Sequence, residues 1–275
     1  MSEILRFEQV SYLYETGALE HDALTDCSLS IHPGEKIAVM GSNGAGKSTF
    51  FLLANGVLRP TGGTIYFEGA PVGKSTRELN ALRQGVGLVF QDSDVQILGG
   101  TVEEEISFGP MNLDLPREEV QSRVEKAVGN LHLEDYRTRA PQYLSGGEKK
   151  RVCIADVLAM HPKLLLMDEP ASSLDFANLQ LLEENLQMLE QQGLALAIST
   201  HDADFAWRWA QRILVFCGGR LAADRSPEEI FSDTELLRRC NLTQPTLYWV
   251  SQALGIVPPP RTRREFETLV SENIR

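Results

Sequence analysis

Residues 41–48 have the sequence Gly41-Ser42-Asn43-Gly44-Ala45-Gly46-Lys47-Ser48, which fits the phosphate-binding P-loop pattern. A loop that wraps a polyphosphate points its backbone N–H groups inward, so its side chains must be small and its φ angles unrestricted. An ordinary glycine-rich turn is the alternative. The apolar strand expected at residues 36–40 and the helix expected at 48–58 supply the context that a P-loop requires. The stretch therefore predicts a nucleotide site.

The chemistry of phosphate binding assigns roles to the end of this loop. The helix that follows directs the positive end of its dipole at the phosphates. Lys47 can reach the β- and γ-phosphates, and the hydroxyl of Ser48 can ligate Mg²⁺. A P-loop alone indicates only a nucleotide, so the catalytic half of the site has to lie elsewhere in the chain.

A second strand ends in two carboxylates and predicts that catalytic half. Residues 164–169 are Leu164-Leu165-Leu166-Met167-Asp168-Glu169, and ligands bind at strand ends in α/β sheets. We expect Asp168 to hold Mg²⁺, directly or through water, and Glu169 to orient or deprotonate the attacking water. Because successive side chains of a strand point in opposite directions, the two acids should serve different partners. The alternative is a strand end with solvated acids.

The alternation of apolar segments predicts the fold class. Strands expected at residues 4–14, 24–31 and 64–67 suggest a partly antiparallel opening region, and helices are expected between about 101 and 136. Buried strands at 164–167 and 194–198 flank a helix at about 176–192, so the core should be α/β with a mainly parallel sheet. A hairpin is expected around residues 213–222. Short helices are expected after Ser226, with a stiff Pro258-Pro259-Pro260 spacer.

Composition excludes several classes of protein. Of 275 residues, 43% are hydrophobic and 23% are charged, which is typical of a soluble globular protein. No apolar run approaches the roughly 18 residues of a membrane span, and the N-terminus lacks a secretory signal. The net charge of −12 disfavours nucleic acid as the main partner. The four scattered cysteines have no metal-like spacing and are expected to be reduced thiols: Cys27, Cys153, Cys217 and Cys240.

A further motif narrows the function. Residues 144–151, Leu144-Ser145-Gly146-Gly147-Glu148-Lys149-Lys150-Arg151, lie at an expected helix start, where two glycines expose backbone N–H groups. This is a second phosphate-binding surface. Because the P-loop already cradles its own nucleotide, the natural ligand of this surface is the γ-phosphate held by another copy.

With both halves of the site at normal spacing, residues 4–225 resemble the ATPase subunits of ABC transporters. The resemblance implies a P-loop NTPase (RecA-like) α/β core with an antiparallel β subdomain, an inserted α-helical signature subdomain at about residues 93–150 and a small helical C-terminal appendage. It implies an ATP-binding domain over residues 1–225, an extension over 226–275, and two cofactors, ATP and Mg²⁺.

The same resemblance assigns individual residues. Tyr14 resembles the aromatic residue that stacks on adenine, with Tyr12 as the alternative. Gln91 resembles a glutamine that senses the γ-phosphate and Mg²⁺, and residues 173–175 resemble a loop that crosses a dimer interface. The implied catalytic set is Glu169, His201, Lys47 and Gln91, and the implied metal ligands are Ser48, Gln91 and Asp168. The implied nucleotide-binding set is Tyr14, Gly41, Ser42, Asn43, Gly44, Ala45, Gly46, Lys47, Ser48, Thr49, Gln91, Ser145, Gly146, Gly147, Glu148 and His201.

A narrower resemblance is carried by residues 91–96, 101–110 and 227–231, which are similar to the energy-coupling-factor branch of the family. Residues 242–245 and the helix after them resemble the ATPases of cobalt importers. The chain departs from the family's pattern at Ala171-Ser172-Ser173, at Phe176, at Glu148 and at Asp156. None of these departures removes a catalytic group, but they could alter interface packing and the rate of hydrolysis.

The resemblance implies a motor in which two copies sandwich two ATP molecules at the cytoplasmic face of the membrane. Its partners would be a second ATPase subunit, identical or paired, an integral-membrane coupling subunit and a substrate-binding membrane subunit. A soluble ATPase of DNA repair or translation is one alternative, but the chain has neither a coiled-coil insertion nor a second nucleotide domain. An exporter motor is the other. Nickel or a vitamin could replace cobalt as the cargo.

Overall fold

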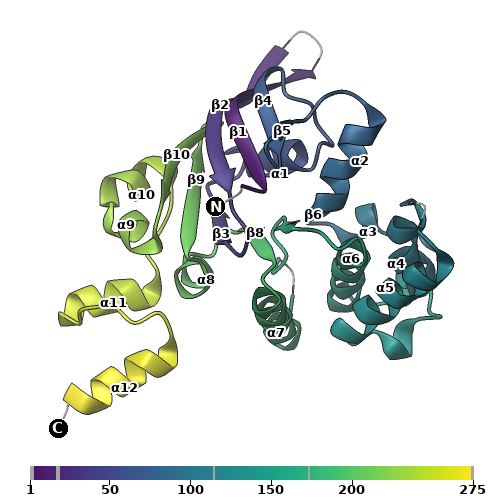
Figure 1. The fold of residues 1–275 in the computed structure, drawn as a ribbon. Coiled ribbons are helices and arrows are strands. Elements are labelled where there is room, and N and C mark those ends of the chain that lie inside the picture. Colours follow the sequence, from purple (N-terminus) through teal and green to yellow (C-terminus); the bar gives the residue numbers. More distant parts are fainter. Residues whose placement is uncertain (1–2, 17–18, 114, 173, 274–275) are drawn as a thin grey trace.

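The computed structural model describes residues 3–16, 19–113, 115–172 and 174–273, and its centre is a sheet of six strands (Figure 1). The strand order is β10-β9-β3-β8-β7-β6. Neighbouring strands from β9 to β6 pair in parallel, and β10 is antiparallel to β9. The predicted α/β fold with a mainly parallel sheet is confirmed. Its strands are β3 (Lys36–Met40), β6 (Val86–Val89), β7 (Leu164–Met167), β8 (Ala195–Ser199), β9 (Arg212–Cys217) and β10 (Arg220–Arg225).

A separate antiparallel sheet forms from the opening region of the chain, as expected. Its order is β2-β1-β4-β5. The first hairpin is longer than the sequence pattern indicated, because β1 and β2 stay paired as far as Thr16 and Leu19. The strands are β1 (Leu5–Thr16), β2 (Leu19–Ile31), β4 (Gly62–Phe67) and β5 (Ala70–Pro71).

Helices surround the central sheet and form the insertion and the C-terminal extension. The helix α2, which begins with a capping box between Ser75 and Glu78, was not expected from the sequence. The helices are α1 (Lys47–Ala54), α2 (Thr76–Gly85), α3 (Ser93–Gln96), α4 (Val102–Met111), α5 (Arg117–Asn130), α6 (Gly146–Ala159), α7 (Phe176–Gln191), α8 (Ala203–Trp209), α9 (Pro227–Ser232), α10 (Thr234–Cys240), α11 (Thr246–Leu254) and α12 (Arg263–Asn273).

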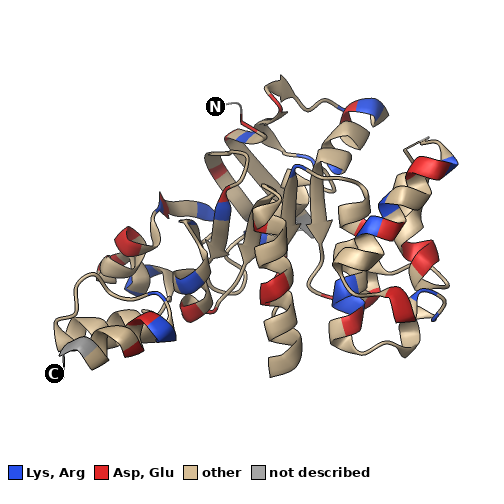
Figure 2. Cartoon of the chain, turned by 60° about the horizontal axis from the view of Figure 1, so that its bottom comes forward, with Lys and Arg blue, Asp and Glu red and all other residues tan. Residues whose placement is uncertain are grey.

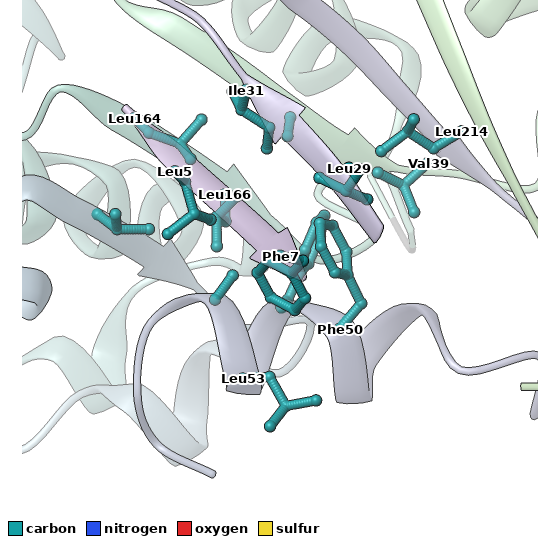
Figure 3. Packing of buried hydrophobic residues seen from close by; sticks show 14 of the residues in the cluster. Leu5, Phe7, Leu29, Ile31, Val39, Phe50, Leu53, Leu164, Leu166 and Leu214 are labelled. Carbon is teal, nitrogen blue, oxygen red and sulfur yellow. The ribbon is translucent and has the colours of Figure 1, made fainter. Parts of the chain in front are cut away.

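The core between the two sheets fixes the position of α1. Side chains of successive strand residues point to opposite faces, so Val39, Leu164 and Leu214 face the antiparallel sheet and α1 (Figure 3). Phe50 of α1 is fully buried, and its ring lies 5.1 Å from that of Phe7 in β1. The start of α1 is therefore held rigidly at the end of β3.

The helical insertion packs on a different side of the central sheet. Figure 1 shows α3 to α6 grouped beside β6. Buried residues of α4, α5 and α6, such as Ile106, Val124 and Val152, form one cluster with Leu165 and Met167 of β7. Asp156 of α6 is a polar exception: burial raises its pKa to about 7, with a further contribution from the charge of Glu105.

The first part of the C-terminal extension covers the face of β9 and α8. Phe231 of α9 is fully buried, and its ring lies 6.1 Å from that of Trp207 in α8. The indole of Trp207 also donates a hydrogen bond to the carbonyl of Pro260, at 2.9 Å. Further along, Trp249 and Leu254 of α11 are exposed. The start of the extension therefore caps its own domain, while α11 presents apolar side chains outward.

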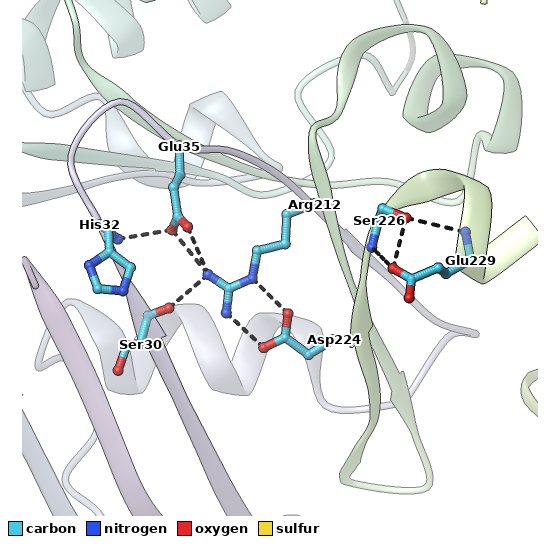
Figure 4. A network of polar contacts seen from close by, with 7 residues as sticks. All are labelled: Ser30, His32, Glu35, Arg212, Asp224, Ser226 and Glu229. Atoms are coloured by element: carbon cyan, nitrogen blue, oxygen red, sulfur yellow. Dashed lines mark hydrogen bonds and ion pairs between the residues drawn. The ribbon is translucent and has the colours of Figure 1, made fainter. Parts of the chain in front are cut away.

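A network around Arg212 joins the two sheets near the beginnings of strands β3 and β9 (Figure 4). Arg212 of β9 donates to both carboxylate oxygens of Asp224 in β10, at 2.6 and 2.7 Å, and to Glu35 and the carbonyl of Ser30. The hydrogen bond to Asp224 is the largest cause of the raised pKa of Arg212. The network ties the β2–β3 turn to the hairpin that precedes the extension.

Across the described ranges, the helices are too short or too polar to cross a membrane.

The buried ring of Phe231 provides a test of how the extension packs. We expect Phe231→Ala to lower the free energy of unfolding by about 3–5 kcal/mol, because truncating a buried aromatic side chain leaves a cavity. Leu254→Ala is the matched control on the exposed helix, and it should change stability by no more than about 0.5 kcal/mol. Denaturant unfolding of both variants measures the difference. Equal stabilities would show that the extension does not pack on its own domain.

Candidate nucleotide site

Four neighbouring parallel strands, β3, β8, β7 and β6, end at one edge of the central sheet and open into a common cavity. The residues after β3 form the P-loop, and β6, β7 and β8 lead to Gln91, Asp168 and His201. The cavity has a volume of about 1150 Å³. Its lining is Tyr14, Ala23, Gly41, Ser42, Asn43, Gly44, Ala45, Gly46, Lys47, Ser48, Thr49, Gln91, Asp168, Glu169, His201, Asn241, Leu242 and Thr243.

The P-loop is folded around its own lysine. Lys47 is buried, and its ammonium donates to the carbonyls of Gly41, at 2.8 Å, and Ser42, at 3.3 Å. Gly46, the residue before α1, has a φ of +106°, and a Cβ there would lie 2.7 Å from the carbonyl oxygen of Ala23. Only glycine fits this position. The loop therefore presents the unpaired N–H groups of the first turn of α1 to the cavity.

The two acids after β7 share one serine. Ser199, at the end of β8, donates its hydroxyl hydrogen to Asp168, and its oxygen accepts the backbone N–H of Glu169 at 2.8 Å. The backbone N–H of Asp168 bonds the carbonyl of Val89 in β6, at 2.9 Å. Ser199 is fully buried, so it fixes the first acid and the start of the second in a definite orientation.

The direction of Glu169 has a different cause from the one we expected. Strand β7 ends at Met167, so alternation along a strand does not set the directions of the acids. Glu169 has a φ of +43°, in the left-handed region that is rare for residues other than glycine. It also precedes Pro170, which disfavours helical backbone at this position. Such strain is characteristic of functional sites, where surrounding contacts enforce it.

His201 lies within hydrogen-bond distance of this glutamate. Its Nδ1 lies 3.1 Å from Oε2 of Glu169. The glutamate side chain is 14% exposed and the histidine side chain 72% exposed. The next residue, Asp202, caps α8 by accepting the N–H of Phe205 at 3.0 Å. The histidine is thus anchored by a helix start but presents its ring to the opening, where it can contact a bound group.

The two candidate aromatic residues differ in position. Tyr14 lines the cavity, whereas Tyr12 is packed against the core between the sheets. Their rings form an edge-to-face pair with centroids 4.8 Å apart. This arrangement favours Tyr14 as the surface for a nucleotide base, with Tyr12 supporting it from behind.

The motif of residues 144–151, here called the signature, lies outside the cavity at the N-terminus of α6, the signature helix. Ser145 caps the helix, its hydroxyl accepts the N–H of Glu148, and Glu148 accepts the N–H of Ser145 at 2.6 Å. That backbone hydrogen bond is the main reason why the pKa of Glu148 is lowered. The glutamate that departs from the family's pattern is therefore engaged in a capping box. Gly147 is tightly packed, because a Cβ there would collide with Asn178.

The loop after Pro170 is only partly described. Ser173 lies outside the described residues. Asp175 caps α7, and its carboxylate accepts the backbone N–H of Asn178 at 2.9 Å. Asn178 is the residue that packs against Gly147, so the end of this loop lies beside the signature helix.

Sequence reasoning missed two features of the site: a serine that holds its two acids, and three cavity residues from the C-terminal extension. Ser199 is the first residue of the stretch 199–202 that drew attention to His201, but it was given no role, although the strand-end rule could have identified it. Asn241, Leu242 and Thr243 come from the C-terminal extension, after α10, and nothing in their residue types indicates a nucleotide site. Their contribution depends on how the extension folds back over β9.

The oxygen atoms in the cavity suit Mg²⁺. The hydroxyl of Ser48, the amide of Gln91 and the carboxylate of Asp168 all lie in the lining, and hard oxygen ligands are those that Mg²⁺ prefers. Among the described residues, no cluster of three or more His, Cys, Asp or Glu side chains could cage a metal.

Comparisons with known proteins agree with this geometry. A family model described as ABC transporter matches residues 24–172. The EcfA2 energy-coupling factor transporter ATP-binding protein of Methanospirillum hungatei is 44% identical over 279 residues, 99% of this chain and 69% of that protein. The EcfA protein of Methanocaldococcus jannaschii is 41% identical over 232 residues, 84% of this chain and 83% of that protein.

Two solved structures have the same fold. One is cbiO1 from Clostridium perfringens, described as part of the ABC transporter complex cbiONQ. It has a TM-score of 0.76 and 35% identity, and the match covers 93% of this chain and 100% of that chain. The other is an ATP-binding cassette in a dimeric post-hydrolysis state bound to ADP and Pi. Its TM-score is 0.73 with 27% identity, covering 81% of this chain and 98% of that chain.

The shared serine can be tested by stability. Ser199→Ala leaves an oxygen of Asp168 and the N–H of Glu169 without their partner, so unfolding should become easier by about 1–3 kcal/mol. Ser251 is equally buried, but its hydroxyl only bonds the carbonyl of Leu247 within α11. Ser251→Ala should therefore have a much smaller effect in the same denaturant titration. Similar losses in both variants would contradict the orienting role of Ser199.

Proposed function

We propose that this chain, which belongs to the ABC transporter family of ATPases, powers an energy-coupling-factor importer as its ATP-hydrolysing subunit. The observation that carries the proposal is the convergence of Lys47, Gln91, Asp168, Glu169 and His201 on one cavity. Relatives that are 44% and 41% identical are energy-coupling factor transporter ATP-binding proteins. The family hydrolyses ATP, so the remaining question is what each residue does.

The P-loop binds the triphosphate of ATP. Its backbone N–H groups and the start of α1 meet the phosphate oxygens. Lys47 exchanges the carbonyl of Gly41 for the β- and γ-phosphates, because a buried ammonium favours an anionic partner over a neutral one. Tyr14 stacks on adenine at the rim. Ser48, Gln91 and Asp168 hold Mg²⁺, which when bound neutralises charge on the phosphates.

Hydrolysis needs a water molecule in line with the γ-phosphate. The backbone of Glu169 is held in the left-handed conformation. Its carboxylate accepts a proton from the water while the oxygen of the water attacks the γ-phosphorus. The bond from the γ-phosphorus to the β–γ bridging oxygen breaks, so ADP leaves and inorganic phosphate forms. His201, 3.1 Å from Glu169, contacts the γ-phosphate and keeps the carboxylate in place.

A second ATPase subunit completes the site. The N-terminus of α6 lies outside the cavity of its own chain, yet its exposed Ser145 and Gly146 form a surface suited to a phosphate. The simplest ligand is the γ-phosphate bound by the P-loop of the partner. A dimeric state of a related cassette with ADP and Pi supports this arrangement. The two subunits would then enclose two ATP molecules between them.

The membrane partner would contact the insertion. Large apolar side chains that are at least 59% exposed are Val95 in α3, Leu98 just after it, and Phe108 and Met111 in α4. Because Val95 and Leu98 follow Gln91 closely in the chain, a docked helix of the membrane subunit would be coupled to the nucleotide. The chain would then lie at the cytoplasmic face of the membrane, with a coupling subunit and a substrate-binding subunit.

The cargo is proposed to be cobalt. The support is the similarity of residues 242–245 to the ATPases of cobalt importers and the structural match to a cbiONQ component. Nucleic acid is disfavoured as a partner, because the net charge is −12 and Figure 2 shows acidic and basic residues interspersed on the insertion and the extension. Purification of the membrane complex and metal analysis of its bound ligand would separate cobalt from nickel or a vitamin.

The role of Glu169 gives the principal test. Glu169→Gln keeps the shape but removes the charge, so it should spare Mg–ATP binding and slow hydrolysis by roughly a hundred- to ten-thousand-fold. Unhydrolysed ATP should then hold two copies together. Size-exclusion chromatography with Mg–ATP and a phosphate-release assay measure both effects.

Two other variants separate binding from chemistry. Asp168→Asn should lose Mg²⁺-dependent binding, and Lys47→Ala should lose ATP binding or turnover because the triphosphate has no direct cationic partner.

Wild-type hydrolysis by a monomeric Glu169→Gln variant would show that another residue is the base, with His201 the next to examine. Near-wild-type activity in Lys47→Ala would contradict the proposal that the P-loop binds the triphosphate of ATP.

A further inference from the structure

A buried lysine that the mechanism above does not use lies directly behind Gln91. Lys150, in the second turn of α6, is only 4% exposed. Its ammonium donates to the carbonyls of Phe90, at 2.9 Å, and Gln91, at 2.7 Å. Burying an ammonium is costly unless hydrogen bonds compensate, so a lysine on two backbone carbonyls is a specific arrangement.

The charge environment places this ammonium close to the nucleotide site. Burial lowers the pKa of Lys150, and the opposing influences include the negative charges of Asp92 and Asp168. Lys150 is thus within electrostatic reach of the carboxylate proposed to hold Mg²⁺. Lysine is suited to this role because its flexible stem can bring a point charge between two carbonyl oxygens.

The same loop is attached to α6 at further points. The side-chain oxygen of Gln96 accepts the N–H of Phe90 at 3.0 Å, and its amide donates to the carbonyl of Cys153 in α6 at 3.2 Å. Lys149 forms an ion pair with Asp94 at 2.6 Å. The Gln91 loop, residues 90–96, is therefore bound to α6 on both sides of Gln91.

We infer that Lys150 is a positioning residue for Gln91 and that it couples the Gln91 loop to the signature end of α6. Lys150 follows the capping residue Ser145 by five positions, about 7.5 Å along the helix axis. A displacement of the loop, by a docked membrane subunit or by the γ-phosphate, therefore moves the helix start that faces the partner's nucleotide. The inference rests on the proposed function, because Gln91 has a role only if it contacts nucleotide or metal.

Kinetics of the full-length chain test the inference. Lys150→Met removes both donors, so kcat should fall about tenfold or more, as expected for hydrogen bonds from a charged group. The Mg²⁺ concentration for half-maximal activity should rise, while ATP affinity stays near wild type because the P-loop is unchanged. Lys149→Met is the comparison variant: it removes the ion pair with Asp94 in the same loop but no hydrogen bond to the backbone of Gln91, so kcat should fall less than in Lys150→Met. Lys150→Arg, which keeps the charge and donors, should recover part of kcat.

A double-mutant cycle with Gln91→Ala separates positioning from a purely structural role. If Lys150 acts through Gln91, adding Lys150→Met to Gln91→Ala should cause little further loss of kcat. Fully multiplicative losses, or wild-type kcat and Mg²⁺ dependence in Lys150→Met, would overturn the inference. Should Lys150→Met not fold, Lys150→Gln, which retains an amide donor, enters the same cycle with the same criteria. Wild-type hydrolysis by Glu169→Gln would instead count against the proposed function.

Discussion

The site depends on the convergence of parallel strand ends at one edge of the central sheet. Because β3, β8, β7 and β6 are neighbours and point the same way, residues distant in sequence meet at hydrogen-bond distance. Ser199 at the end of β8 contacts both acids after β7, and the N–H of Asp168 bonds β6. The packing of α1 between the two sheets then fixes the P-loop relative to these acids.

The cavity and the surface that we propose to bind the partner's γ-phosphate are linked through α6. The N-terminus of α6 lies outside the lining of the chain's own cavity, while its second turn holds the backbone of Gln91 through Lys150. The C-terminal extension makes a second link, because its residues 241–243 line the cavity and Thr246 bonds Asp204 in α8, close to His201. Contacts of the insertion or the extension with other subunits can therefore be transmitted to the nucleotide.

Motif spacing and strand ends were enough to predict the fold class and most of the residues that line the cavity, whereas residues 145–148 of the predicted set lie outside it in this chain. The hydrogen bonds of Ser199 and the turn at Glu169 could not be predicted, because they depend on the register between β7 and β8 and on a φ of +43°. The extension was harder still. Its apolar residues were visible in the sequence, but only the fold shows that Phe231 packs on Trp207 whereas Leu254 is exposed.

The central claim is that the signature helix of one copy completes the ATP site of another. A crosslink between two different chains tests it most directly. Asn43 in the P-loop and Gly146 in the signature are both exposed. One preparation carries Asn43→Cys and another carries Gly146→Cys, so a disulfide between these two positions can form only between different chains. After mixing and oxidation, we predict a disulfide-linked dimer that forms with Mg–ATP and not with ADP. Absence of this dimer, or equal yields without nucleotide, would contradict the account.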